Sequence, residues 1–528
     1  MTITGSQIIG SQSSRESPSE FFAVAPATGQ RLEPAFAEAS AAEAAAALEL
    51  ADRAAPELYG ASGRARAELL EAIAEQIMAL GDALIERASA ETALPAARLS
   101  GERARTVGQL RLLASYAREG SWVNARIDRA DPKRQPLPKP DVRSMLRPLG
   151  PVVVFSASNF PLAFSVAGGD TASALAAGCP VIVKAHPAHP GTSELVGHAV
   201  QRALAGSKLP EGTFSMLQGA SNELGRLLVQ HPLTRAVAFT GSLAGGRALF
   251  DAAQRRPEPI SVFAEMGSVN PVVVLPFALA RRAAAIAEGL YQSLTAGVGQ
   301  FCTNPGLVLV VQSGETRAFI DLLAERVRKT PAGTMLAPRI AQGYGAGLGR
   351  NSGLSGVQVA AQGEPATAAC GAVTTLLTTS GATFLATPDL EHELFGPCTL
   401  VVECASHAEL EQVVERLKGQ LTATLHAEPD EIAEHGRLFQ LLERRVGRVI
   451  VDGFPTGVEV CHAMQHGGPY PATTDPRFTS VGSNAVLRFV RPVCLQNVPE
   501  LRLPDELKSH NPCGILRLVD GVSTRDPC

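Results

Sequence analysis

The first patterned stretch of the chain carries apolar positions spaced three or four residues apart. Residues 38–58 and 63–91, rich in Ala, Leu and Glu, show this spacing, which predicts two amphipathic helices, and a third is expected over 97–119. The polar residues that precede them predict a flexible start. Each helix has one apolar face that must be covered by another layer of the fold.

From residue 151 the pattern changes to short β-branched runs separated by helical segments. Strands are expected at 152–155, 180–184, 213–217, 236–239 and 260–264, with helices beginning near Pro161, Pro190, Ser221 and Ser242. Strands that alternate with helices predict a parallel, doubly wound α/β sheet. A second α/β unit is expected from Asn270, with a helix over 279–295, a strand over 307–311 and a helix over 315–329.

Two segments punctuated by proline do not fit this alternation. Residues 121–150 and 486–498 have the texture of exposed edge strands, and neither has an obvious partner within a compact domain. We expect them to pack on something else, such as a second subunit.

Composition narrows the class of protein. The 528 residues are 45% hydrophobic and 19% charged, with a net charge of −4 and no long block of either sign, so nucleic acid and membrane are not expected partners. A small molecule is the expected ligand. The nine cysteines never form Cys-x-x-Cys, which favours reduced thiols. The polar N-terminus and the absence of about 18 uninterrupted apolar residues predict a cytoplasmic protein that is neither exported nor membrane-spanning.

Polar residues follow several of the expected strands. Asn159 comes after the first strand, and Gly241 and Ser242 come after the fourth, in the run Phe-Thr-Gly-Ser-Leu-Ala-Gly-Gly. Ligands of open α/β sheets lie outside the carboxyl ends of the strands, and a glycine-rich helix start accepts a pyrophosphate. Taken singly, Asn159 and Ser242 are explained equally well as ordinary helix caps.

A carboxylate and a thiol complete a possible constellation. Glu265 ends the fifth strand, and Cys302 lies in Gly-Val-Gly-Gln-Phe-Cys-Thr-Asn-Pro-Gly, in the next connection from helix to strand. A thiol that attacks, a carboxylate that takes a proton and the Asn159 amide that holds an oxyanion are the parts of covalent catalysis at a carbonyl. The alternative for Cys302 is a small apolar filler, which most free cysteines are.

Other candidates are weaker. His462 and His466 are four residues apart, but they lack the glutamate of His-Glu-x-x-His and are followed by Gly-Gly-Pro, so we expect a loop on the substrate side and no metal site. No Gly-x-Ser-x-Gly occurs, which argues against a serine hydrolase. The remaining cysteines at 179, 370, 398, 404 and 494 are expected in the core or near the surface.

Six motifs in one order resemble the NAD(P)-dependent aldehyde dehydrogenase superfamily. They are Ser158–Pro161, Val183–Lys184, Phe239–Ser242, Glu265–Gly267, Gly299–Cys302 and Glu393–Pro397. The resemblance implies an α/β fold with a Rossmann-like cofactor domain (residues 1–120 and 151–267) and a catalytic α/β domain (268–480). It also implies a small β oligomerisation element with a C-terminal tail (121–150 and 481–528), and hence a homodimer or homotetramer.

The resemblance also assigns roles to single residues. Cys302 is expected to attack an aldehyde, Asn159 and the Cys302 backbone N–H to hold the oxyanion, and Glu265 to activate the water that hydrolyses the thioester. A catalytically inactive relative would have lost the thiol or the carboxylate, and both are present.

The expected cofactor contacts come from the same motifs. The resemblance places Lys184 on the adenosine ribose, Glu393 on the nicotinamide ribose, Phe395 beside the nicotinamide, and Gly241 and Ser242 under the pyrophosphate. Relatives that prefer NAD commonly carry a glutamate three positions after the lysine, where this chain has Pro187. His186 could donate to a 2′-phosphate, so NADP is expected to be accepted and preferred, with NAD also used.

The substrate expectation is drawn from two segments. Residues 299–306 and 464–475 resemble the α-ketoglutarate semialdehyde (2,5-dioxovalerate) dehydrogenases, with NADP-dependent long-chain fatty aldehyde dehydrogenases as the alternative. In the family, the third helix lines the substrate entrance. Here it carries several arginines over 101–111, too polar for an alkyl tunnel, although these arginines could all be solvated.

Overall fold

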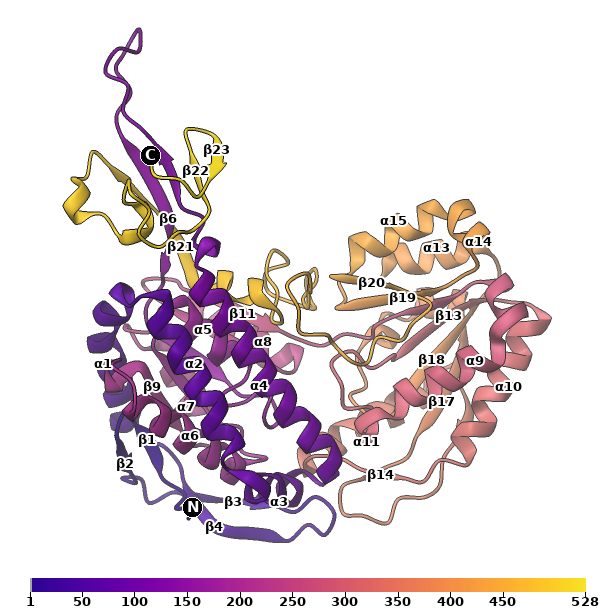
Figure 1. Ribbon diagram of the computed structural model, residues 1–528. Helices are drawn as coiled ribbons and strands as arrows, with labels where there is room; N and C mark the ends of the chain where they lie inside the picture. Colours follow the sequence, from indigo (N-terminus) through magenta and orange to yellow (C-terminus); the bar gives the residue numbers. More distant parts are fainter. Residues whose placement is uncertain (1) are drawn as a thin grey trace.

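The computed structural model describes residues 2–528 and contains two α/β units side by side, with a strand-rich extension projecting from the first (Figure 1). The N-terminus lies on the first unit, and the C-terminus lies in the extension. No helix within residues 2–528 combines the length and the apolar character that crossing a membrane requires.

The first unit is built on a seven-stranded sheet in the order β11-β10-β7-β8-β9-β1-β2. Its five parallel strands are β7 (Val152–Phe155), β8 (Val181–Lys184), β9 (Phe214–Leu217), β10 (Ala236–Thr240) and β11 (Ser261–Glu265). The predicted parallel, doubly wound sheet is confirmed, because each neighbouring pair among these strands is parallel.

The prediction of a flexible N-terminal segment is wrong. Strands β1 (Gln7–Ile9) and β2 (Gln12–Ser14) form a hairpin that adds to the sheet, β1 pairing antiparallel with β9. The Ile8 side chain is fully buried, and the Gln7 side-chain oxygen accepts the Gln218 backbone N–H at 2.6 Å. The hairpin covers the otherwise unpaired edge of β9, which its polar sequence did not reveal.

Helices cover both faces of this sheet. They are α1 (Ala41–Gly60), α2 (Gly63–Met78), α3 (Gly81–Thr92), α4 (Ala96–Glu119), α5 (Gly169–Ala177), α6 (Pro190–Ala205), α7 (Asn222–Gln230) and α8 (Leu243–Gln254). The single helix predicted over 63–91 is two helices, separated before Gly81, whose φ is +58°.

The helix predicted to begin at Pro161 begins instead at Gly169. Residues 161–168 form turns, in which the backbone N–H groups of Leu162 and Ala163 donate to the buried Glu102 carboxylate at 2.8 and 3.0 Å. Asn159 therefore stands in a loop rather than at a helix start, which removes the explanation of Asn159 as a helix cap.

The second unit contains another seven-stranded sheet, in the order β15-β17-β18-β13-β12-β19-β20. Its strands are β12 (Val272–Val274), β13 (Leu307–Val311), β15 (Gln358–Gln362), β17 (Thr375–Ser380), β18 (Cys398–Cys404), β19 (Thr422–His426) and β20 (Arg448–Val451). Helices α9 (Pro276–Thr295), α10 (Gly314–Arg328) and α11 (Pro338–Ser352) accompany it. All pairs are parallel except β15 with β17.

The extension is a five-stranded sheet in the order β21-β6-β5-β22-β23. Its strands are β5 (Arg126–Asp128), β6 (Val142–Pro148), β21 (Val490–Gln496), β22 (Arg517–Val519) and β23 (Val522–Thr524). The two proline-punctuated segments pair with each other, from Val142 opposite Gln496 to Pro148 opposite Val490. Each segment thus finds its partner in the other, outside both seven-stranded sheets, and contact of this extension with a second subunit stays a prediction.

Candidate active site

The loop that carries Cys302 joins α9 to β13 and is held in an unusual backbone conformation. Gly297, Val298 and Gly299 all have positive φ, which is rare for a β-branched residue such as Val298. A Cβ on Gly299 would lie 2.3 Å from the Gly396 carbonyl, so the loop can approach residues 396–397 this closely only with glycine there. The Asn270 amide donates to the carbonyls of Cys302 and Asn304, each at 2.9 Å.

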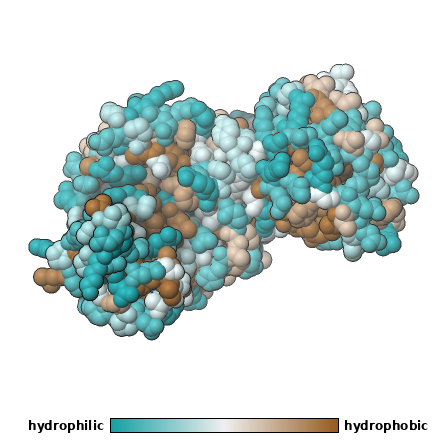
Figure 2. Space-filling view, turned by 90° about the horizontal axis from the view of Figure 1, so that it is seen from above, coloured by the Kyte–Doolittle hydropathy of each residue, from teal (hydrophilic) through white to brown (hydrophobic). Residues whose placement is uncertain are grey.

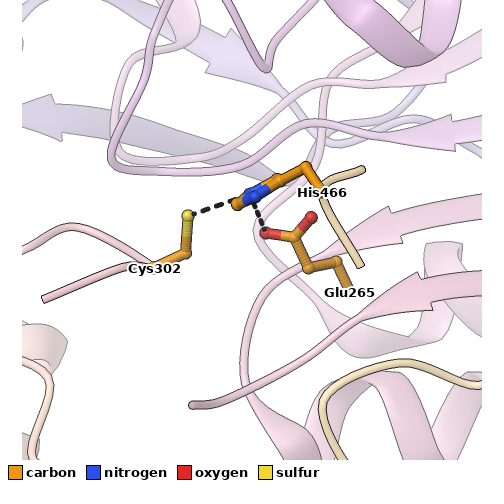
Figure 3. A group of neighbouring side chains, drawn as sticks. All are labelled: Glu265, Cys302 and His466. Atoms are coloured by element: carbon orange, nitrogen blue, oxygen red, sulfur yellow. Dashed lines mark hydrogen bonds and ion pairs between the residues drawn. The ribbon is translucent and has the colours of Figure 1, made fainter. Parts of the chain in front are cut away.

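Three side chains from distant parts of the chain meet at this loop (Figure 3). The Cys302 Sγ lies 3.4 Å from Nε2 of His466, and the same nitrogen lies 3.1 Å from Oε1 of Glu265. The other Glu265 oxygen, Oε2, accepts a hydrogen bond from Ser480 Oγ at 2.6 Å. Glu265 and His466 are buried, whereas Cys302 is half-buried and can be reached by a ligand.

The charges of this group follow from its surroundings. Burial raises the pKa of Glu265, but the attraction of His466 and the hydrogen bonds from His466, Ser480 and Cys302 outweigh burial, so its pKa is lowered overall. Burial and the Glu265 charge hold the pKa of the Cys302 thiol well above its usual range. The resting group therefore contains a neutral thiol beside an ionised carboxylate.

The ionised carboxylate also fixes the role of His466. If Nε2 of His466 carried no proton, its lone pair would repel the Glu265 Oε1 atom 3.1 Å away. The tautomer with its proton on Nε2 is therefore assigned to His466. Nε2 makes its hydrogen-bond contact with the Cys302 sulfur, and its approach to Glu265 Oε1 is close but lacks hydrogen-bond geometry. The buried Nδ1 has no hydrogen-bond partner among residues 2–528.

His466 is the site residue that sequence reasoning missed. Its loop was expected on the substrate side, but its contact with Glu265 depends on a long segment folding back against β11. Met266 N–H donates to the Ala472 carbonyl at 2.7 Å, and Thr473 bridges to Glu265. The ligand atoms of Glu265, Cys302 and His466 lie within 4.8 Å of one another, close enough to share a metal ion. The expectation of no metal stays a prediction.

Asn159, in the loop after β7, contacts the cysteine loop. It is buried, and its Nδ2 donates to the Gln300 carbonyl at 3.1 Å, two residues before Cys302. The amide has a second N–H, and the Cys302 backbone N–H makes no hydrogen bond within residues 2–528. Two donors are thus available beside the sulfur.

The predicted pyrophosphate contacts lie at the carboxyl end of β10. Gly241 and Ser242 are exposed at the start of α8, where Ser242 Oγ accepts the Gly245 N–H at 3.2 Å. A Cβ on Gly241 would lie 2.6 Å from the Phe239 ring. Because β7 is flanked by β10 on one side and β8 on the other, the chain reverses its winding here, which is where open α/β sheets bind ligands.

The predicted ribose and nicotinamide contacts are divided between the two units. Lys184 ends β8, and its Nζ donates to the Gly219 carbonyl at 2.5 Å. Burial lowers the pKa of Lys184 to about 8, although Glu38 opposes this. Glu393 and Phe395 line a pocket of about 430 Å³ together with Phe301 of the cysteine loop. Burial and the Glu265 charge raise the pKa of Glu393 to about 7.

His186 does not carry a positive charge near neutral pH. Burial, together with the neighbouring His189 and Lys184, lowers its pKa well below the ordinary value. Its Nδ1 accepts the Ala188 N–H at 3.2 Å, and its ring stacks on His189 with 5.5 Å between centroids. Only the Nε2–H is left to donate to a ligand.

Comparison with known proteins identifies the family of the chain and its fold. Residues 13–469 match the model of the Aldehyde dehydrogenase family, and the chain belongs to this family. The solved structure of a betaine aldehyde dehydrogenase from Staphylococcus aureus, in complex with NAD+, superposes with a TM-score of 0.79. It is 18% identical, and the match covers 94% of this chain and 96% of that chain. The α/β architecture of the family is thereby confirmed.

Two relatives are much more similar in sequence. The alpha-ketoglutaric semialdehyde dehydrogenase 2 of Azospirillum brasilense is 53% identical, over 99% of each chain. The alpha-ketoglutaric semialdehyde dehydrogenase of Acinetobacter baylyi is 47% identical over 87% of this chain and 88% of its own.

Proposed function

We propose that this chain oxidises α-ketoglutarate semialdehyde to 2-oxoglutarate with NADP. The observation that carries the proposal is the group formed by Cys302, Glu265 and Asn159 in a chain that is 53% identical, end to end, to an alpha-ketoglutaric semialdehyde dehydrogenase. A nucleophile, a base and oxyanion donors converging on one point define acyl chemistry at an aldehyde carbon.

The first step forms a bond between sulfur and the aldehyde carbon. The thiol proton passes to the Glu265 carboxylate, of which one oxygen lies within 4.8 Å of Sγ. As the negative charge moves from oxygen to sulfur, the His466 Nε2–H, which lies 3.4 Å from Sγ, stabilises the thiolate. The aldehyde oxygen becomes an oxyanion, which Asn159 and the Cys302 backbone N–H hold by hydrogen bonds.

The second step releases the acid. A nicotinamide cofactor, when bound, would supply the acceptor for the hydride of the thiohemiacetal carbon. Cys302 then holds the acyl group as a thioester. Glu265, having lost its first proton to solvent, takes a proton from water so that hydroxide attacks the thioester. The thiolate leaves as the carboxylic acid forms, and Glu265 returns the proton to Cys302.

The chain's residues fit a dinucleotide. The N-terminus of α8 is open to an anionic pyrophosphate at Gly241 and Ser242, and Lys184 offers a cation for the adenosine ribose. Glu393 would accept from the nicotinamide ribose, with Phe395 beside the ring.

NADP is favoured over NAD by position 187, where proline replaces a carboxylate that would repel a 2′-phosphate. His186 adds one N–H donor rather than a charge. We expect a higher kcat/KM with NADP, and we expect the Pro187→Glu variant to lose efficiency with NADP more than with NAD. A strong NAD preference of the wild type contradicts this part of the proposal.

The substrate is tested by side-by-side assays with α-ketoglutarate semialdehyde, succinic semialdehyde and decanal. The proposal expects the highest kcat/KM with α-ketoglutarate semialdehyde. If decanal gave the highest value, the substrate assignment would be wrong, while the thioester mechanism would still stand.

We also propose that the extension joins two or four copies of the chain. Its sheet ends in β21, whose outer edge is unpaired, and it carries Leu501, which is 89% exposed, and Val522, which is 65% exposed. Figure 2 looks onto the end of the molecule that bears this extension, where hydrophobic patches lie on the first unit. Sedimentation of a stable monomer at micromolar concentration would count against an oligomer.

A further inference from the structure

One arginine of helix α4 faces the site without a partner of its own. The Nη1 atom of Arg105 is buried and has no hydrogen-bond partner, and Arg105 makes no ion pair within residues 2–528. Its guanidinium lies 5.1 Å from the centre of the Phe164 ring and 5.8 Å from that of Phe160. A buried cation with donors left unmade is costly to fold unless a ligand completes them.

Its neighbour on the same helix is engaged in a different way. The Arg98 guanidinium lies 4.9 Å from the ring centres of both Phe160 and Phe301, and it donates to the Asn159 carbonyl at 3.1 Å. Arg98 thus holds the cysteine loop and the asparagine loop together. Arg98 therefore has a structural role, whereas the guanidinium of Arg105 remains available to bind a ligand.

Arg105 lies near the cysteine loop, because its guanidinium contacts the Phe160 ring and the centre of that ring lies 5.2 Å from that of Phe301. Burial lowers its pKa, while Glu102, Cys302, Glu265 and Glu459 attract it electrostatically. Oε1 of Glu102 accepts the backbone N–H groups of Leu162 and Ala163, and its Oε2 lies 3.9 Å from Nη2 of Arg98. Glu459 is exposed on a loop. The guanidinium therefore shares an electrostatic environment with the nucleophile but has no carboxylate bonded to it.

We propose that Arg105 binds the carboxylate of the substrate and so selects short anionic aldehydes. The inference rests on the proposed function and deepens it. A guanidinium presents parallel N–H donors that match a carboxylate, and Phe160 and Phe164 form an apolar wall beside it. A substrate whose carboxylate binds Arg105 and whose aldehyde lies at Cys302 is held at both ends. A neutral aldehyde is held only at Cys302.

The test compares charged and neutral aldehydes of equal chain length on Arg105→Met. We expect KM for α-ketoglutarate semialdehyde to rise roughly 10- to 100-fold, the range for hydrogen bonds to charged groups, with kcat little changed. KM for pentanal should be unchanged or lower, and this activity also reports that the variant is folded. Arg105→Lys, which keeps the charge but not the paired donors, should fall between.

Arg111→Met is the matched control, because Arg111 is exposed on the same helix. It should leave both KM values unchanged. Equal changes toward the charged and neutral aldehydes in Arg105→Met, or no change in either, would overturn the inference.

A second pair, succinic semialdehyde and butanal, separates this inference from the proposed function. If the wild type favours anionic aldehydes over neutral ones but not α-ketoglutarate semialdehyde in particular, and Arg105→Met abolishes that preference, the proposed substrate fails and the role of Arg105 stands. If α-ketoglutarate semialdehyde is the best substrate and Arg105→Met leaves its KM unchanged, the proposed substrate stands and the role of Arg105 fails.

Discussion

The two sides of Cys302 are built differently. On one side the Glu265 carboxylate is bonded to His466 and Ser480, so the charge has partners inside the protein. On the other side the Arg105 cation is bonded to no oxygen within residues 2–528, and its contacts are aromatic rings. A paired, buried group is held in place and can move a proton reproducibly, whereas an unpaired one gains its partner only when a ligand arrives.

The side of Cys302 that carries Glu265 therefore performs the chemistry, and the side that carries Arg105 selects the substrate. Variants on the side of Glu265 should therefore change kcat for charged and neutral aldehydes alike. Variants on the side of Arg105 should change KM for the charged ones. The largest effects are expected on the first side.

The largest effect of all is expected at Glu265. Glu265→Gln keeps the thiol but loses the base for hydrolysis, so one reduced cofactor per active site should form in a burst, followed by near arrest of turnover. Stopped-flow absorbance of the reduced cofactor measures the burst. Cys302→Ala is the control and should show neither burst nor turnover, and full turnover by Cys302→Ala would refute covalent catalysis by this thiol.

A smaller effect is expected at His466. His466→Leu removes the N–H that faces the Cys302 sulfur, and loss of one such donor to a developing charge costs ~10²-fold in rate. His466→Gln retains an N–H and should recover part of the rate. The measurement is the single-turnover rate of hydride transfer, with pentanal and α-ketoglutarate semialdehyde affected equally. If the His466→Leu and His466→Gln variants transferred hydride equally slowly, loss of the hydrogen bond would not explain the lower rate.

The smallest effect concerns the pKa of Cys302, read from the pH dependence of its alkylation by iodoacetamide. Negative charge on Glu265 and Glu393 raises this pKa, so removing either charge should move the alkylation midpoint to lower pH. The shift should be larger for Glu265→Gln than for Glu393→Gln. Glu393 has a pKa of about 7, so it is ionised, and contributes, only above that pH.

Glu364→Gln serves as the control for these alkylation curves. Glu364 is exposed and is not among the groups that shift the Cys302 pKa. Its curve should coincide with that of the wild type. A Glu265→Gln midpoint that stayed in place or moved to higher pH would show that the carboxylate does not hold the thiol protonated.

The sequence by itself determined the layers of this protein and the residues nearest to the chemistry. Short β-branched runs and apolar positions spaced three or four residues apart are local patterns, so they marked the parallel strands and the helices. The order of short motifs marked Cys302, Glu265 and Asn159 at the ends of connections, where α/β sheets present ligand groups.

Tertiary structure alone decided what those patterns leave open. His466 joins the site because a loop more than 160 residues after Cys302 folds back onto β11. The same holds for β1 on the edge of β9 and for β6 against β21, which pair across the length of the chain. Whether Arg98 or Arg105 remains without a partner depends on which rings and carbonyls surround each guanidinium. No local pattern encodes that, because burial and pairing are properties of the packed chain rather than of its neighbours in sequence.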